Sequence, residues 1–340
     1  GWTPAEDDFE ALHEIIVRLD GSPLAIELAA ARLRMLTPAG LLGRLDQRFK
    51  LLSRRGDGSR RQDTLRATID WSWDLLEPWE QAALAQLSVF RGGFFLEAAE
   101  EILDLTAYPH APWTMDVVGS LLDHSLLWSQ KIQGQPRFRM YESIRAYAAN
   151  QLNDVEELTG AQTRHSHYFA ALGSLESLDA LYVHGGLERM RWMITELENL
   201  LAGFEAAVTL KEPDLAQGCA VAAALVLQDI GPLQTGKELV ERALTVPGLE
   251  ERGALILLRE MIWFLSLDGR VEEAIELGRS TLVRAQKLED SIQESRLQSI
   301  LAFLHRGPAN AAIADVYYTN ALRLARQVGD RALEGVILNN

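Results

Sequence analysis

Apolar residues recur at helical spacing along almost the whole chain. At the start, three segments each place apolar side chains on one helix face, namely residues 9–19, 23–36 and 37–49. The glycine-rich, basic stretch over residues 52–63 has no such period. We therefore expect a compact group of three helices followed by a linker.

The pattern changes in the next part of the chain. Helical periodicity over residues 64–76, 78–90, 96–103 and 114–127 is followed by two short alternating segments, 126–132 and 137–142, around the sequence QGQP. Alternation on both sides of a Gly/Pro turn indicates a β-hairpin. Helices closed by a hairpin predict a winged-helix domain, and a helix over residues 143–152 would lead out of it.

From about residue 161 onward the periodicity is entirely helical, and part of it repeats. Leu282, Ala285 and Asp290 recur 40 residues later with the same residue types. That interval fits paired-helix repeats, which need their neighbours to bury an apolar face. The fold class predicted is mainly α: a helical domain over 1–53, a winged helix over 64–155 and a tetratricopeptide-like α-solenoid over 160–340.

Charge and composition narrow the function classes. The 340 residues carry a net charge of −15, which argues against a broad electrostatic surface for nucleic acid or an anionic membrane. Cys219 is the one cysteine, so a disulfide framework is excluded and a cytoplasmic location is expected. The chain starts at Gly1 and stops within a helical pattern, so we expect it to be part of a longer protein.

One segment imitates a phosphate-binding loop. Residues 231–238 read GPLQTGKE, which satisfies Gly-x-x-x-x-Gly-Lys, but Glu238 stands where Ser or Thr would bind Mg²⁺. The strand that should precede such a loop is also missing from the pattern. We interpret the segment as a turn between two helices.

Other candidate chemistry has a structural explanation. His165 and His167 are two apart and would not share a helix face, so a solvated surface is expected rather than a metal pair. Trp71 and Trp73 occupy core-like helical positions, and the paired glutamates at 100–101, 156–157 and 272–273 fit solvated faces. We expect no metal site and no enzyme activity from this chain by itself.

A winged helix raises the possibility of DNA binding. The segment in the place of the recognition helix, residues 114–127, contains neither Lys nor Arg, and Lys131 is the first basic residue of the hairpin. Helices that read bases normally supply Arg, Asn or Gln with basic residues beside them. We therefore do not expect this unit to bind DNA.

Six blocks in a fixed order resemble a known family. They read GSPLAIELAAARLRML, LLGRLDQRFKLL, TLRATIDWSWDLL, LAQLSVFRGGFFLEAAE, LLDHSLL and RFRMYESIRAYA. In this order they resemble the helical and winged-helix part of bacterial signal-transduction ATPases with numerous domains (STAND), the NB-ARC or AP-ATPase group. Some members of that family are transcriptional regulators with tetratricopeptide-like sensor repeats.

The resemblance implies roles for three residues in an intact parent protein. Gly21 and Pro23 form the family's Gly-x-Pro motif, which lies against ADP or ATP held with magnesium by a preceding ATPase domain. Tyr141 stands where relatives carry a histidine that senses the nucleotide phosphate. The fragment itself would hold no cofactor.

The resemblance also implies a switch and its partners. The helical and winged-helix domains would close over the chain's own nucleotide-binding domain at rest, and the repeats would receive a protein or small-molecule signal. Activation would allow a homo-oligomer to form, and no membrane partner is expected. The alternative is a winged-helix DNA-binding transcriptional regulator with a helical ligand-binding domain.

Overall fold

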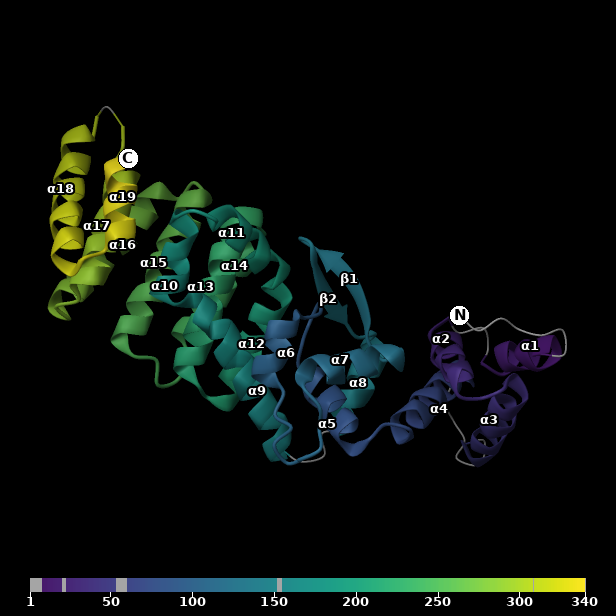
Figure 1. The fold of residues 1–340 in the computed structure, drawn as a ribbon. Helices are drawn as coiled ribbons and strands as arrows, with labels where there is room; N and C mark the ends of the chain where they lie inside the picture. The colour runs from purple at the N-terminus through teal and green to yellow at the C-terminus, as the bar shows by residue number, and fades with distance from the viewer. Residues whose placement is uncertain (1–7, 20–22, 53–59, 152–154, 308, 340) are drawn as a thin grey trace. The chain divides into compact units, whose positions relative to one another are not determined.

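The computed structural model describes residues 8–19, 23–52, 60–151, 155–307 and 309–339. The chain divides into two compact units, residues 1–161 and 162–340. Each unit is helical apart from one hairpin in the first (Figure 1). The expected fold class is therefore confirmed, while the three domain boundaries expected from the sequence remain a prediction.

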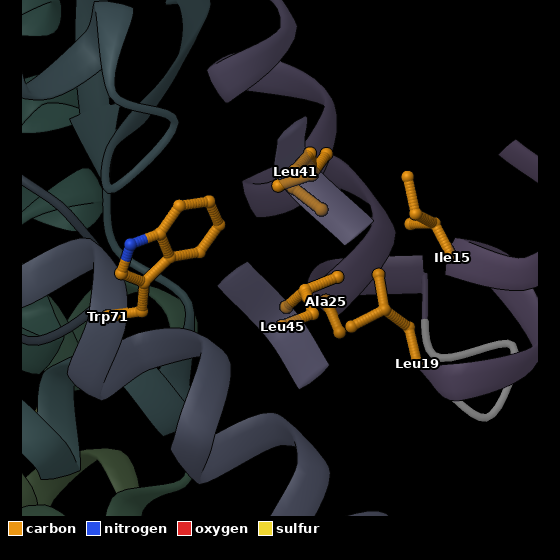
Figure 2. Close-up of a cluster of buried hydrophobic side chains, with 7 residues drawn as sticks. Ile15, Leu19, Ala25, Leu41, Leu45 and Trp71 are labelled. Carbon is orange, nitrogen blue, oxygen red and sulfur yellow. The ribbon is translucent and has the colours of Figure 1, made fainter. Parts of the chain in front are cut away.

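The first unit begins with four helices around a small apolar core: α1 (Phe9–Arg18), α2 (Pro23–Ala31), α3 (Pro38–Leu52) and α4 (Arg60–Asp74). Ile15, Ala25, Leu41, Leu45 and Trp71 meet there, one or two from each helix (Figure 2). The small side chains of the alanine-rich α2 let α4 approach closely. Burial of these apolar groups is the main term that holds the four helices together.

Two boundaries differ from the sequence prediction. The helix expected over 23–36 ends at Ala31 and continues as a short 3₁₀ turn, η2 (Arg32–Arg34). The expected linker is shorter than 52–63, because α3 extends to Leu52 and α4 begins at Arg60. The basic, polar residues 60–63 take up helical backbone as the first turn of α4, whose later residues Ala67, Ile69 and Trp71 are buried in a core.

The winged helix is built from α5 (Pro78–Leu87), α6 (Leu96–Ile102), α7 (Thr114–Asp123), β1 (Trp128–Ile132), β2 (Gln135–Arg139) and α8 (Glu142–Gln151). Val117, Val118 and Leu121 bury the inner face of α7. The two strands are antiparallel and joined by Gln133 and Gly134, both at positive φ, as a tight hairpin turn requires. The predicted hairpin is confirmed, although Pro136 lies within β2 rather than in the turn.

A third short strand position completes the wing. Phe94 forms an isolated antiparallel bridge with Phe138 of β2, with hydrogen bonds of 2.9 and 2.8 Å between their backbones. Gly93, just before it, has φ +97°, and an added Cβ would lie 2.5 Å from the Phe138 carbonyl oxygen. Only glycine fits that backbone and that approach.

The second unit is a stack of helices in which consecutive helices pack against each other. Helix α9 (Val155–Ala170) crosses the division between the units at residue 161. The elements that follow it are η3 (Ala171–Gly173), α10 (Leu175–Asp179), η4 (Ala180–Tyr182), α11 (Gly186–Thr195), α12 (Leu197–Leu210), α13 (Pro213–Ile230), α14 (Leu233–Leu244), α15 (Glu251–Leu267), α16 (Val271–Lys287), α17 (Ser291–Leu304), α18 (Ala311–Val328) and α19 (Arg331–Asn339) (Figure 1). Alternate helices α13, α15 and α17 contact one another along one side. This is the arrangement of a paired-helix solenoid.

The 40-residue period is visible in the structure. Helices α15, α17 and α19 begin at residues 251, 291 and 331. The two repeated aspartates play the same role, because Asp290 accepts a hydrogen bond from the Gln293 amide at 3.1 Å and Asp330 accepts one from Leu333 at 2.9 Å. Each therefore caps the first turn of the helix that follows it.

The expected solvated surface at the two histidines is wrong for His165. That residue is only 1% exposed and its ring lies 4.7 Å from the ring of Phe169, while His167 is exposed. The next residue, Ser166, is also buried and donates to the Gly203 carbonyl of α12 at 2.9 Å. Both His165 and Ser166 of α9 therefore lie in the core. The two-residue spacing of His165 and His167 indicates only that they do not share a helix face, and not which of them is buried.

Gly93→Ala should destabilise the winged helix by about 2 kcal/mol or more, because the new Cβ strains the backbone and clashes with the Phe138 carbonyl. Gly119→Ala is the matched control, since its Cβ meets nothing within 4 Å in the interior of α7, and should stabilise the chain slightly. Urea unfolding followed by circular dichroism measures both. Equal transition midpoints for the two variants would contradict the close packing of Gly93 against β2.

Candidate functional sites

Two of the three residues predicted to face a nucleotide can be located in the first unit. Pro23 is exposed at the first position of α2, and Gly21 lies outside the described residues. Tyr141 follows β2, and its hydroxyl donates to the Glu27 carboxylate on α2 at 2.9 Å. The structure thus joins Tyr141 to the helix that begins at Pro23, across 114 residues of sequence.

The hydrogen bond to Glu27 is the main cause that raises the pKa of Tyr141, with burial a smaller one. The hydroxyl is therefore held in its protonated form and directed at a carboxylate. Glu27 was not singled out from the sequence. One signal was available, because it is the single charged residue between Pro23 and Ala31.

A buried arginine makes a second connection within this unit. Arg32 of η2 is 2% exposed, and its Nη1 lies 2.6 Å from His124 Nδ1 at the end of α7. A guanidinium can only donate, so Nδ1 accepts and the imidazole proton sits on Nε2. That nitrogen lies 3.7 Å from Glu80, which also accepts a hydrogen bond from Ser120.

The position of this arginine is electrostatically unfavourable. Burial lowers the pKa of Arg32, and the nearby Glu80 carboxylate only partly offsets it. Its Nε and Nη2 have no hydrogen-bond partner among the described residues. His124 is thus the contact that ties this guanidinium to the winged helix.

The surface that a winged helix would turn to DNA is acidic and apolar. Around α7 the exposed side chains include Trp113, Met115, Asp116 and Asp123. Residues 76–153 contain five Lys or Arg against nine Asp or Glu. Phosphate contacts depend on basic side chains, and this segment has few of them.

The arginines of the wing are engaged within the domain. Arg137 is 1% exposed, donates to the carbonyls of Gly92 and Gly93 at 3.2 and 2.9 Å, and lies over the Phe95 ring. Arg139 donates to the Gly92 carbonyl at 2.9 Å. Both guanidinium groups hold the loop before α6 against β2, so their charges are committed to folding.

The second unit contains a pocket of about 400 Å³ on the side formed by α13, α15, α17 and α19. Its apolar wall comes from one or two residues of each of these helices: Leu225, Trp263, Leu267, Ile300, Leu333 and Val336. A volume of this order is sufficient for a small organic molecule.

Two ion-pair groups form the polar part of the pocket. Arg259 and Glu260 are 6% and 4% exposed and pair at 3.0 Å, and Gln228 donates to the second Glu260 oxygen at 3.0 Å. Arg296 bridges Asp179 of α10 at 2.7 Å and Asp330 before α19 at 2.8 Å. Burial disfavours the charge of Arg296, but these two carboxylates more than offset it and raise its pKa.

The pocket was not found from the sequence beyond the expectation that the repeats carry a binding face. Asp179 and Arg296 are 117 residues apart, and no local pattern links them. The only available signal was the repeat itself, whose first helices line one side of a solenoid.

The segment that imitates a phosphate loop lies at a helix–helix junction, but only Gly231 and Pro232 form the turn between α13 and α14. Residues 233–238 are the start of α14, and Gly236 lies so close to the Phe264 ring that an added Cβ would be 2.1 Å from it. Lys237 pairs with Asp268 at 2.8 Å. The glycine serves packing and the lysine serves an ion pair, which leaves no cradle for a phosphate.

The described residues offer neither a cluster of metal ligands nor a membrane-spanning helix. No group of three or more His, Cys, Asp or Glu among them is placed to hold a metal ion. Within the same residues no helix has the length and apolar character to cross a bilayer.

Comparison with known proteins identifies one domain by family. Residues 76–153 match the family described as the winged helix-turn-helix domain. A Mycobacterium tuberculosis protein, provisionally named an HTH-type transcriptional regulator, is 33% identical over 338 residues, which is 98% of this chain and 34% of that protein. A Mycobacterium bovis protein of the same description matches to the same extent.

The chain therefore spans about a third of the length of these curated relatives. An uncharacterized Mycobacterium tuberculosis protein is 37% identical over 164 residues, covering 47% of this chain and 41% of that protein. Among solved structures, a STAND protein with a tetratricopeptide repeat sensor from Pyrococcus horikoshii covers 92% of this chain and is itself covered to 55%. Its TM-score is 0.31 at 14% identity.

His124→Ala should destabilise the first unit by about 2–3 kcal/mol, because it leaves the buried Arg32 guanidinium without the acceptor it now has. His110→Ala, at an exposed position, is the control and should change stability by less than about 0.5 kcal/mol. Thermal and urea unfolding of both variants provide the measurement. A His124 variant as stable as the control would show that this contact contributes nothing.

Proposed function

We propose that this chain is the regulatory sensor and transducer part of a STAND-type ATPase of the NB-ARC group. Its helical and winged-helix domains would close over the nucleotide site of a preceding ATPase domain in the resting state. Its helical repeats would receive a protein or small-molecule signal and loosen that closure. In physical terms this is a two-state element that two separate sites bias.

The observation that carries the proposal is the formed pocket among the repeats, combined with a winged helix whose arginines are committed internally. The pocket offers a place for a signal, and its polar groups connect α10 near the start of the second unit with α19 near its end. The curated relatives are about three times as long, which leaves room for ATPase and effector domains.

In the longer protein the cofactor would be ADP or ATP with magnesium, and this chain would supply one edge of its site. Pro23 fits an apolar wall because it is exposed at the start of α2. Tyr141 fits the role of a hydrogen-bond donor to the nucleotide. In this structure its hydroxyl donates to Glu27, so this hydrogen bond would have to break before the hydroxyl contacts a nucleotide. The ATPase activity would belong to the preceding domain and not to this chain by itself, whose residues 231–238 pack as part of a helix pair.

The second candidate is a winged-helix transcriptional regulator that binds DNA directly. The family match over residues 76–153 and the names of the relatives favour it. The net charge of that segment and the burial of Arg137 argue against it. A regulator could also act through an effector domain elsewhere in the longer protein, which would reconcile the names with the transducer role.

The test uses the longer protein, which should retain ADP on purification. Tyr141→Phe removes one hydroxyl and should accelerate ADP release and raise basal output by about tenfold, the effect of losing a hydrogen bond to a charged group. Glu27→Gln is the matched control, because it alters the hydroxyl's present partner without removing the hydroxyl, and should leave ADP release within about twofold. Pro23→Ala should give a milder acceleration.

Two results would contradict the proposal. A longer protein that neither retains nor binds adenine nucleotide would exclude the ATPase assignment. Identical ADP release from Tyr141→Phe and the unmodified protein would show that the tyrosine serves only to hold Glu27.

A further inference from the structure

The pocket of the second unit has an excess of negative charge. Two guanidinium groups, Arg259 and Arg296, stand against the carboxylates of Asp179, Asp229 and Glu260 on its wall. The fourth carboxylate, Asp330, is paired to Arg296 just behind it. Carboxylates thus outnumber guanidinium groups by two, and a bound anion would meet net repulsion.

Asp229, one of these carboxylates, is exposed to solvent. No hydrogen bond or ion pair from the described residues reaches its carboxylate, whereas Glu260 is occupied by Arg259 and Gln228. Asp229 also lies in the last turn of α13 (Pro213–Ile230), where the carbonyl ends of the helix add partial negative charge. A cation placed here would be stabilised by both.

Aromatic and apolar surface lies beside this carboxylate. The rings of Trp263 and Tyr182 line the pocket together with Leu225 and Leu267. Trp263 is held in place by an edge contact with Phe303 at 5.1 Å between ring centres. Aromatic faces attract organic cations through the ring quadrupole, and the apolar wall favours a hydrophobic body.

We propose that this pocket binds a small organic ammonium ion with an apolar or aromatic body. Asp229 serves as its counter-ion, Trp263 and Tyr182 face the cationic group, and the apolar wall holds the remainder. This names the chemistry of the signal and rests on the sensor role proposed above for its biological meaning. The binding itself requires no nucleotide.

The position of the pocket explains how such a ligand would affect helices far apart in the sequence of the second unit. Asp179 comes from α10, and Leu333 and Val336 come from α19, so one occupant touches segments from both ends of the described repeats. The bridge from Asp179 through Arg296 to Asp330 already connects these ends. A ligand beside that bridge would strengthen the connection between them.

The experiment compares three probes of nearly equal size on the whole chain: phenethylamine, phenethyl alcohol and phenylacetate. Binding is followed by ligand-observed NMR and by tryptophan fluorescence. The amine should bind with a Kd of about 1 mM, as expected for so small a molecule, and about tenfold tighter than the acid. The alcohol should fall between them.

Variants locate the effect. Asp229→Asn should weaken amine binding by about two- to fivefold, because the lost partner is solvent-exposed, and leave alcohol binding unchanged. Asp315→Asn is the matched control, an exposed aspartate on α18 away from the pocket, and should have no effect. Trp263→Leu should weaken amine binding by about tenfold, and Trp263→Phe should retain most of it.

The inference is overturned if phenylacetate binds as tightly as the amine, if no amine binding is detected, or if the Asp229 and Asp315 variants behave alike. None of these outcomes bears on adenine nucleotide retention by the longer protein. Failure of the ligand assignment and failure of the ATPase assignment are therefore distinguishable.

Discussion

Buried guanidinium groups need acceptors, and this requirement decides much of how the protein is held together, although Arg32 satisfies it only in part, through His124. An arginine taken out of water loses hydration that only hydrogen bonds and carboxylates can replace. Arg137 donates to two backbone carbonyls, and Arg259 pairs with the carboxylate of Glu260. Arg296 pairs with the carboxylates of Asp179 and Asp330, which lie near opposite ends of the described repeats. Arg137 and Arg296 thereby fix the relative position of segments that are distant in sequence.

The same commitment limits what the winged helix can do. The shape of a DNA-binding domain is present, since the helices, the hairpin and the Phe94–Phe138 bridge lie within or beside the matched segment. Helix α7 carries no Lys or Arg, and Arg137 and Arg139 are used inside the domain, which leaves Lys131 as the exposed basic residue of β1. A domain that keeps its shape but not its basic surface is suited to contacts with other protein domains. This favours a transducer role over direct reading of DNA.

The parts of the structure with local causes could be predicted from the sequence. The helices, the hairpin at Gln133 and Gly134, and the 40-residue repeat all follow from periodicity and turn chemistry within a few residues. The burial of His165, the hydrogen bond from Tyr141 to Glu27 and the Arg296 bridge depend on contacts across 34 to 117 residues. Periodicity describes one helix at a time, and these contacts depend on which helices become neighbours. For that reason the repeats were expected to bind a signal, but the pocket and its charges were not.

The transducer role is tested most directly by measuring duplex DNA binding by the chain as a function of salt, using fluorescence anisotropy. A winged helix that reads DNA loses roughly 10³–10⁵ in affinity between about 50 and 200 mM salt, since each phosphate contact releases counterions. We expect no saturable binding even at the lower salt concentration, and the same result for Lys131→Ala. Tight, steeply salt-dependent binding that weakens on removal of Lys131 would contradict the transducer role.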